Sequence, residues 1–397
     1  MKIKLSYILI ILLLPGLAEA IDSKSFLITI PGFPLSLGRL LFVISGLILL
    51  VKERPRILKN RIFLGFLLIL SGITFASLLF DESEVFIQSL GFFLLLIGSF
   101  GNVNLWERKG LNKIVDLFFI ILIVYWTIRS LSLTFGSGSQ SYSEMYREGE
   151  VINHHVPGML VSISSAYLAV RFFYSENRLR LFGYIIFFTS ILTCLYIESR
   201  SNFLVILVVL IYISLWGRTK RIKKLITVIP ILIVIALMTT QIIQKSEVLS
   251  KRFTFKDPAY QERTSSMRVV YFVEGLKGFT VNPLGKGISD TRVEYKGKNL
   301  MIHNQYLTFL LGGGVITLIG LFFFFIGFWK LIVSISHFQE DNSEPPSKFI
   351  FALAISCMTF FITLFTIEMS GLLFFLMVSY LLYVEKELLR TNVELSI

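Results

Sequence analysis

The chain has 397 residues, of which 54% are hydrophobic and 38 are phenylalanine, and its mean hydropathy is +0.74. This composition excludes a soluble globular fold and predicts a polytopic membrane protein. The formal net charge of +12 does not by itself indicate a nucleic-acid partner. Cations kept on the cytoplasmic side of a membrane account for much of it, so we expect a lipid bilayer as partner and no nucleic acid.

Twelve apolar stretches are candidates for membrane-spanning helices. A helix needs about 20 mostly apolar residues to cross a bilayer core about 30 Å thick, and a shorter helix can still span when the bilayer thins or flanking residues snorkel. The predicted fold class is therefore all-α, a polytopic membrane protein with about 12 transmembrane helices. The candidate spans are residues 5–20, 36–51, 62–80, 85–101, 114–135, 156–173, 181–197, 201–217, 225–243, 304–329, 349–367 and 370–385.

The positions of Lys and Arg in the short loops predict the orientation, because cation-rich short loops stay in the cytoplasm. If the N-terminus is inside, the inner connections hold most short-loop cations, at residues 52–61, 108–113, 171–180 and 217–224. The outer connections are then residues 81–84, 136–155, 198–201, 244–303 and 367–370. This orientation divides the chain into helices one to nine (1–243), a long outer loop (244–303), and helices ten to twelve with a cytoplasmic tail (304–397).

Residues 1–20 admit two interpretations. Lys2, Lys4, the following apolar run and the sequence Ala18-Glu19-Ala20 fit a cleavable signal peptide as well as a first membrane helix. Both interpretations place residue 21 on the outer side. The orientation of the rest of the chain is the same in either case.

The long outer loop is basic, since Lys and Arg outnumber Asp and Glu within it. Its segment from Ser265 to Phe279 has apolar residues at helical spacing and predicts a short amphipathic helix that lies on the membrane or on the helix bundle. The stripe consists of Val269, Phe272, Val273, Leu276 and Phe279. The next segment, VNPLGKG, ends this helix with Pro and Gly, and alone it is interpreted as an ordinary turn.

Three local patterns follow one another on the predicted outer side. The first is SRSNFLVILVVL from Ser199, which places a Ser-Arg pair at the outer end of a helix. The second is RVVYFVEGLKGFTVNPLGKGISD from Arg268, with an Arg, an amphipathic helix and an Asn-Pro-Leu-Gly-x-Gly turn. The third is HNQYLTFLLGGGVITLIGL from His303, with a His-Asn pair that opens a helix. Together these patterns resemble the O-antigen ligase and polymerase superfamily of bacterial membrane glycan enzymes.

The third pattern departs from the superfamily at two positions. The family often has an acidic residue where this chain has Gly312, and a second Gly where it has Thr317. The run Gly312–Gly314 inside a helix costs about 1 kcal/mol per residue in helix propensity. It therefore predicts close helix packing or a local unwinding.

The resemblance implies a GT-C-like fold and a reaction at the periplasmic face of the bacterial inner membrane. A glycan is transferred from a polyprenyl (undecaprenyl) diphosphate to an acceptor hydroxyl, as in the biosynthesis of lipopolysaccharide or a related surface polysaccharide. The acceptor is the lipid A core for a ligase and another lipid-linked repeat unit for a polymerase. The residues do not distinguish these two.

Arg200 and Arg268 are the candidates for binding the diphosphate, since a guanidinium group holds phosphate bidentately and stays charged at physiological pH. The alternative for Arg200 is a structural arginine that snorkels to the interface. The alternative for Arg268 is a solvated loop position. The place of both residues in the family patterns favours the functional interpretation.

His303 is the candidate general base, because an imidazole pKa of about 6.5 lies close to working pH. One base and a good leaving group suffice for direct inversion, and no pair of carboxylates for a retaining mechanism is evident. The alternative is an interfacial histidine that caps a helix together with Asn304. We predict an inverting enzyme with no metal and no cofactor.

Further outer-face residues are candidates for acceptor binding or support. Glu198 adjoins Arg200, and Glu368 lies between two apolar segments, where charge is expensive and often functional. The adjacent His154 and His155 point to different helix faces, which favours an acceptor-side or structural role over metal binding. The two cysteines, Cys194 and Cys357, lie in different apolar spans and predict neither a disulfide nor a metal cluster.

Two other function classes stay open. Twelve spans also suit a secondary transporter, and the run of three glycines resembles the helix breaks at transporter sites. Transporter sites lie near the bilayer midplane, however, whereas the candidates here gather at the outer surface. A non-catalytic partner in polysaccharide export is the second alternative, and for such a protein the outer Arg and His residues are dispensable.

Overall fold

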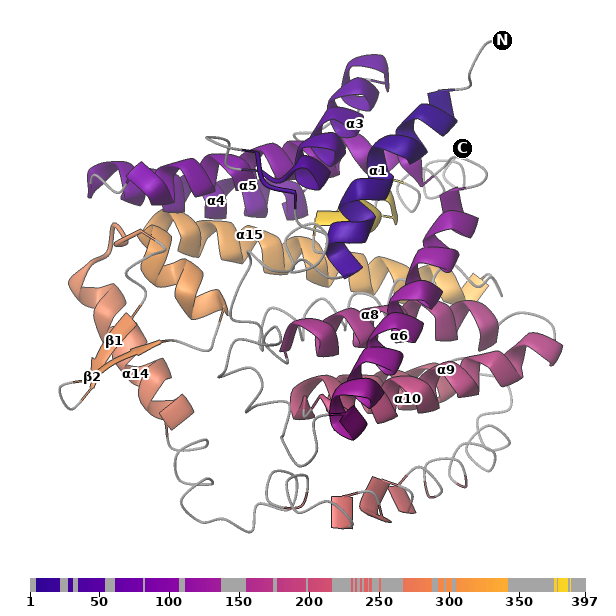
Figure 1. Ribbon diagram of the computed structural model, residues 1–397. Coiled ribbons are helices and arrows are strands. Elements are labelled where there is room, and N and C mark those ends of the chain that lie inside the picture. Colours follow the sequence, from indigo (N-terminus) through magenta and orange to yellow (C-terminus); the bar gives the residue numbers. More distant parts are fainter. Residues whose placement is uncertain are drawn as a thin grey trace. The chain divides into compact units, whose positions relative to one another are not determined.

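The protein is described by a computed structural model that is mainly helical (Figure 1). It describes residues 5–21, 28–30, 35–53, 61–80, 83–106, 111–136, 155–173, 177–197, 199–215, 230, 233, 236–237, 239–241, 243–244, 250, 267–287, 292–295, 298–301, 305–341, 375–376, 378–384 and 386. The chain divides into two compact units, whose segments alternate along the sequence. Unit 1 comprises residues 1–114, 268–342 and 361–397, and unit 2 comprises residues 115–267 and 343–360.

Nine of the predicted spans coincide with helices in the described part of the chain. They are α1 (Leu5–Ile21), α3 (Leu37–Glu53), α4 (Arg61–Leu79), α5 (Ser83–Gly101), α6 (Leu111–Gly136), α8 (His155–Phe173), α9 (Asn177–Tyr196), α10 (Arg200–Leu215) and α15 (Gln305–Asp341). Helix α15 continues well past the predicted end at residue 329, because the apolar run limits the span and not the helix. The predicted spans 225–243 and 370–385 are described only in part, and 349–367 lies outside the described residues.

Among the residues that the structure describes, three helical stretches are long and apolar enough to cross a membrane, at Arg61–Leu79, Ile114–Leu133 and Tyr306–Leu331. Shorter apolar helices occur at Leu90–Gly101 and Leu181–Tyr196. These stretches confirm the prediction of a membrane protein with several spans. The long loop contributes helix α14 (Met267–Val281) and a hairpin that the sequence did not predict, formed by β1 (Arg292–Tyr295) and β2 (Lys298–Met301).

The core of unit 1 is the antiparallel pair α4 and α15, which pack through glycines spaced seven residues apart. Gly65 and Gly72 of α4 face Gly313 and Gly320 of α15, so the two backbones approach closely. An added methyl group at Gly65 would lie 2.5 Å from the backbone nitrogen of Phe324. This is the small-residue packing that membrane helices use in place of a hydrophobic driving force.

A buried hydrogen bond joins the same two helices. Thr317 is fully buried, and its hydroxyl donates to the carbonyl oxygen of Ile69 at 3.2 Å. Thr317 is one of the positions where the chain departs from the superfamily pattern. The hydroxyl therefore takes up space beside Gly72 that a glycine would leave open, and it gains an interhelical hydrogen bond.

Helices α3 and α5 pack in a similar way around the buried Asn102, which begins the short 3-10 helix η2 (Asn102–Leu105). The Asn102 amide donates to the carbonyl oxygen of Phe42 at 3.0 Å and accepts from the hydroxyl of Ser45 at 2.8 Å. Trp106 extends this contact, since its indole N–H donates to the hydroxyl of Ser379 at 3.0 Å. The C-terminal helical residues thus belong to the same core.

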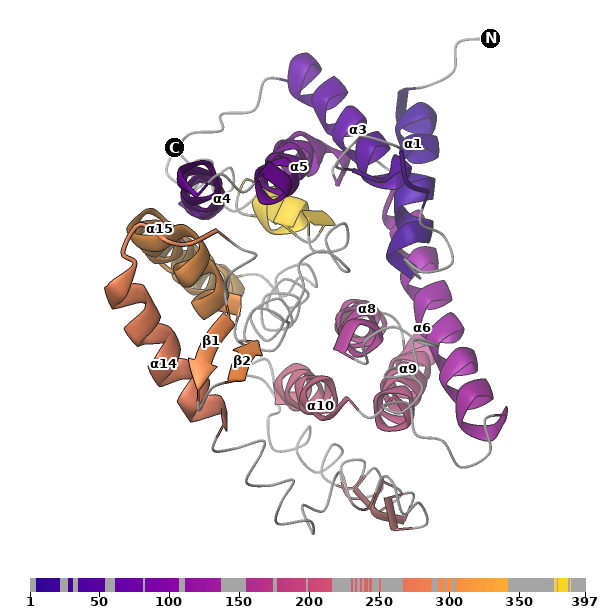
Figure 2. The same cartoon turned by 60° about the vertical axis from the view of Figure 1, so that its left-hand side comes forward.

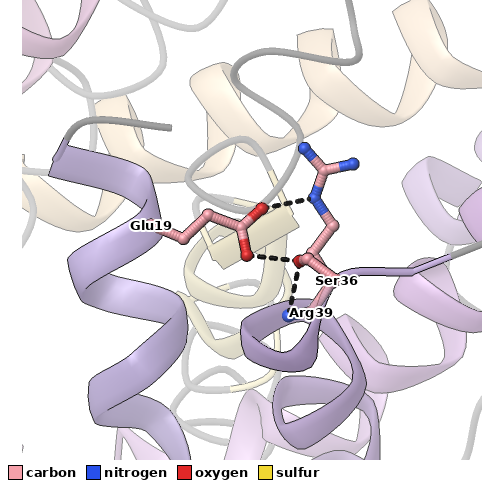
Figure 3. A network of polar contacts seen from close by, with 3 residues as sticks. All are labelled: Glu19, Ser36 and Arg39. Atoms are coloured by element: carbon pink, nitrogen blue, oxygen red, sulfur yellow. Dashed lines mark hydrogen bonds and ion pairs between the residues drawn. The ribbon is translucent and has the colours of Figure 1, made fainter. Parts of the chain in front are cut away.

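A buried polar contact fixes α1 against α3 (Figure 3). Glu19 is 3% exposed, and its carboxylate lies 2.9 Å from the guanidinium Nε of Arg39. The hydroxyl of Ser36 donates to the other carboxylate oxygen of Glu19. Cleavage after Ala20 would leave Arg39 and Ser36 without this carboxylate. Whether residues 1–20 are retained or cleaved stays a prediction with two alternatives.

In the described part of unit 2, α8, α9 and α10 pack on one another (Figure 2), and α6 contacts α8 through the rings of Phe119 and Tyr167. Trp126, Phe119 and Phe187 are among its fully buried side chains. The hydroxyls of Thr127 in α6 and Thr193 in α9 are 2.8 Å apart and share a hydrogen bond. Each unit thus combines an apolar interior with a few buried polar contacts between helices.

Candidate functional site

Arg268 is the second residue of helix α14, and the second half of α14 packs on the first two turns of α15. Gly275 of α14 lies against the side chain of Leu307, and Gly278 lies against that of Leu311. The two helices therefore advance in the same direction. Since Arg268 is two turns before Gly275, it lies at the end where α15 begins.

The Asn-Pro-Leu-Gly-x-Gly turn that follows α14 is bonded to α15 at the three glycines. The N–H of Lys286 donates to the carbonyl oxygen of Leu311, and the N–H of Gly287 donates to that of Gly312, both at 2.9 Å. In the opposite direction, the N–H of Val315 donates to the carbonyl oxygen of Pro283 at 2.8 Å. The turn is thus more than a connection, because it pairs backbone groups that a break in the helix leaves open.

The helix break lies at Gly314, whose φ of 61° and ψ of −146° are not helical. Gly285 and Gly287 of the turn also have positive φ values, 88° and 78°. A methyl group added at Gly285 would lie 2.5 Å from the carbonyl oxygen of Gly312. Positive φ and close backbone approach both require glycine at these positions. The sequence predicted close packing or local unwinding for this run, and the structure has both.

Arg200 is the first residue of α10 in unit 2, and a buried hydrogen-bond network fixes the backbone beside it. The amide of Asn202 donates to the hydroxyl of Ser199 at 2.8 Å. The hydroxyl of Ser162 in α8 donates to the amide oxygen of Asn202 at 3.4 Å. Ser199 is fully buried and its hydroxyl lies close to Gly158 of α8. Arg200 therefore starts a helix whose first turn is tied to α8.

The first turn of α10 offers a favourable place for an anion. The N–H groups at a helix start have no partner within the helix, and the helix dipole adds partial positive charge there. A phosphate close to such a terminus is stabilised by both effects. An arginine at the first position adds a full charge that can bind phosphate oxygens bidentately.

The structure brings Arg268 and the start of α15 to one end of unit 1, and it places Arg200 at a helix start in unit 2. His155 is the first residue of α8. The other predicted site residues, His303, Asn304, Glu198, Glu368 and His154, lie outside the described residues. Their roles, and the absence of a metal, stay predictions.

Comparison with known protein families identifies this part of the chain. Residues 185–323 match the family model described as O-antigen ligase. The predicted resemblance to the O-antigen ligase and polymerase superfamily is confirmed. The match, here called the O-antigen ligase region, runs from α9 into α15 and includes Arg200, Arg268 and His303. A search of curated proteins found no match.

The O-antigen ligase region contains two structural features that the sequence analysis did not predict. One is the set of hydrogen bonds between the turn and the broken helix, which joins the second and third family patterns. Its only signal in the sequence is the pair of glycine-rich segments, 285–287 and 312–314. The other is the network that joins Ser199 and Asn202 of this region to Ser162 of α8, which precedes the matched residues. The SRSN sequence contains Ser199 and Asn202.

Proposed function

We propose that this protein transfers a glycan from a polyprenyl diphosphate to an acceptor hydroxyl at the periplasmic face of the bacterial inner membrane. The observation that carries the proposal is the match of residues 185–323 to O-antigen ligase, which implies a lipid-linked glycan and an acceptor as substrates. The geometry supports it in two ways. Both arginines of the family patterns begin helices, and the two glycine-rich segments of those patterns are bonded into one backbone unit.

In the proposed reaction, the acceptor oxygen attacks the anomeric carbon of the donor glycan. The bond between that carbon and the diphosphate oxygen breaks, and the electron pair leaves with the polyprenyl diphosphate. His303 takes the proton of the acceptor hydroxyl, and the anomeric configuration inverts in this single displacement. The charge that develops on the diphosphate is what Arg200 and Arg268 would stabilise.

The support for Arg200 is the rigidity of its surroundings. A clamp on a leaving group is effective only when its geometry is set before the reaction. The buried Ser199–Asn202–Ser162 network holds the first turn of α10 against α8. Arg200 is therefore the first residue of a helix whose backbone is held in place by this network.

The structure weakens the transporter alternative at one point. A break in a membrane helix serves a transporter when its open backbone groups bind substrate or ion. At the break in α15, the carbonyl oxygens of Leu311 and Gly312 and the N–H of Val315 are paired with the turn. This break is therefore filled by the protein's own backbone.

The experiment that tests the proposal is surface-glycan profiling by gel in the native host without the gene. Wild type, His303→Ala and Arg268→Ala are supplied in turn at matched membrane levels. We expect wild type to restore capped or long-chain glycan and neither variant to do so. Rescue by both variants would contradict the proposal and favour the transporter or the export partner.

The same gels distinguish the two acceptors. A polymerase that fails leaves single repeat units attached to lipid A. A ligase that fails leaves unattached polymer on the polyprenyl carrier. Either product supports glycan transfer, and the product that accumulates names the acceptor class.

A further inference from the structure

Helix α14 has three different sides. One side packs on α15 through Gly275, Gly278 and the partly buried Phe279. A second side is apolar yet exposed, with Phe272 at 50%, Val273 at 43% and Leu276 at 39%. We call these three residues the exposed strip. The strip contains residues of the predicted amphipathic stripe, so most of that stripe does not face the protein.

The third side of α14 is charged. The ammonium group of Lys277 lies 2.7 Å from the carboxylate of Glu274, and the Lys277 side chain is 65% exposed. A helix with one packed, one apolar and one charged side fits a boundary between protein, lipid and water. In a loop surrounded by water, the apolar side chains of the exposed strip would have no apolar surface to contact.

The depth of this helix follows from its contacts with α15. The apolar span in α15 is Tyr306–Leu331, and the turn after α14 is bonded to Leu311, Gly312 and Val315. At 1.5 Å per residue, these positions lie about 8 to 13 Å along the span from its first residue. Residues 281–287, here called the tip, thus lie at the depth of the span rather than above it.

The tip itself has the properties that a bilayer demands. Val281 is 75% exposed and Leu284 is 56% exposed, so apolar side chains face outward from it. Its backbone is paired with α15, and Gly285 and Gly287 are buried. Irregular backbone occurs at membrane depth only where the protein satisfies its polar groups, and in this turn the N–H groups of Asn282, Gly285, Lys286 and Gly287 all donate to backbone carbonyl oxygens.

We propose that residues 267–287 form a re-entrant segment whose exposed strip, together with Val281 and Leu284, is embedded in the lipid of the bilayer leaflet where α15 begins. The occupant of this surface is bilayer lipid, because the apolar surface continues onto the exposed side of α15. There Val315 is 42% exposed and Phe322 is 65% exposed. The segment belongs to the membrane-embedded part of the protein and not to an aqueous loop.

This arrangement also sets the level of Arg268. It lies about 10 Å before Gly275 along α14, and Gly275 is beside Leu307 at the start of the span. Arg268 therefore lies at the lipid headgroup level, where the phosphates of any membrane lipid are found. This inference holds whether or not the protein transfers glycans.

The test is the accessibility of single spin labels in the full chain reconstituted into liposomes. Cys194 and Cys357 are first replaced by Ala, and a nitroxide is attached to Phe272→Cys, Leu276→Cys or Leu284→Cys. Power saturation then compares collisions with oxygen, which concentrates in lipid, and with a nickel chelate, which stays in water. Glu274→Cys and Lys277→Cys are the matched controls on the same helix, and Phe322→Cys is the lipid-facing reference.

We expect the strip and tip labels to collide mainly with oxygen, as the Phe322→Cys label does, and the two control labels to collide several-fold more with the nickel chelate. High nickel collision at all α14 positions would place the helix in water and overturn the proposal. Low collision with both reagents at the strip would show that protein covers it, which would also overturn the proposal. Variants are compared only where size-exclusion profiles match that of the parent.

Discussion

The backbone N–H of Val315 donates a 2.8 Å hydrogen bond to the carbonyl oxygen of Pro283, 32 positions earlier in the sequence, and so joins the second and third family patterns. The partners lie directly after the helix break and at the start of the turn. Together with the hydrogen bonds from the N–H groups of Lys286 and Gly287 to α15, this bond fixes the turn at the end of α14 against α15. The position of Arg268 at the start of α14 therefore depends on glycines at the other end of that helix.

The first prediction concerns these glycines. Gly314→Ala and Gly285→Ala each introduce a side chain at positive φ and against backbone atoms. We expect each variant to lower the free energy of unfolding by about 2 kcal/mol or more, and to lower glycan transfer. Thermal unfolding of the purified protein in detergent measures the first effect.

Gly278→Ala is the matched control. Gly278 is helical, and a methyl group there would lie 3.1 Å from a side-chain atom of Leu311, which can shift. Alanine is also more favourable than glycine inside a helix, by about 1 kcal/mol. A melting temperature for Gly278→Ala as low as that of Gly314→Ala would contradict our account of the turn.

The second prediction concerns the packing of α4 on α15. Gly65→Ala and Gly320→Ala place a methyl group within 2.8 Å of backbone atoms of the other helix. Both should destabilise the protein by several kcal/mol, since the two backbones must move apart. Thr317→Val removes only the hydrogen bond to Ile69 and keeps the side-chain volume, so its cost should be near 0.6 kcal/mol. Equal losses in the three variants would argue against backbone approach as the main contact.

The third prediction concerns the network beside Arg200. Asn202→Ala removes the hydrogen bonds to Ser199 and from Ser162. If the network positions Arg200, the donor KM should rise about tenfold or more while the protein stays folded. The rate is measured against donor concentration in reconstituted vesicles.

Thr127→Val serves as the control for Asn202→Ala. It removes the partly buried hydrogen bond between Thr127 and Thr193 in the same unit. Its stability cost should be similar, but its donor KM should equal that of wild type. An Asn202→Ala variant that loses stability without any change in donor KM would show that the network is only structural.

The fourth prediction concerns the buried pair of Glu19 and Arg39. Arg39→Gln leaves the buried Glu19 carboxylate without this guanidinium, which costs about 3 to 5 kcal/mol, and Glu19→Gln should cost less because Arg39 is 16% exposed. The double variant should be more stable than either single variant, because no uncompensated charge is left. A double-mutant cycle on thermal stability measures this coupling, and additive losses would contradict it.

The pair of Glu19 and Arg39 also leads to a prediction about whether the N-terminal helix is retained. Intact-mass spectrometry of the protein isolated from its host should find residues 5–21 still attached, because Glu19 is part of the core of unit 1. A mass that corresponds to cleavage after Ala20 would show that the contact between Glu19 and Arg39 is absent from the mature protein.

Helix positions could be predicted well from the sequence, because a bilayer imposes a length and an apolar composition on every span. The end of α15 could not, since residues 330–341 continue the helix beyond the apolar run. The hairpin β1–β2 was missed because it lies in a polar loop without a strong alternation pattern. Its four-residue strands give little signal.

The candidate site could likewise be predicted only in part from the sequence. The family patterns identified Arg200 and Arg268, and the structure places each at the start of a helix. The hydrogen bonds of Pro283, Lys286 and Gly287 with α15 could not be predicted. They join backbone groups, and backbone groups leave no residue preference except the glycines that permit the geometry. The exposed strip of α14 was likewise unpredictable, since its glycine side and not its apolar side packs on α15.

Glycan transfer can be measured with the purified protein in liposomes that contain a polyprenyl-diphosphate-linked glycan and an acceptor. Wild type should release free polyprenyl diphosphate and form the linked glycan in equal amounts, without added metal. His303→Ala should form neither product, and Arg268→Lys should be slower because lysine lacks the bidentate fork. Equal transfer by wild type and His303→Ala, or no transfer by wild type with either acceptor class, would contradict the account.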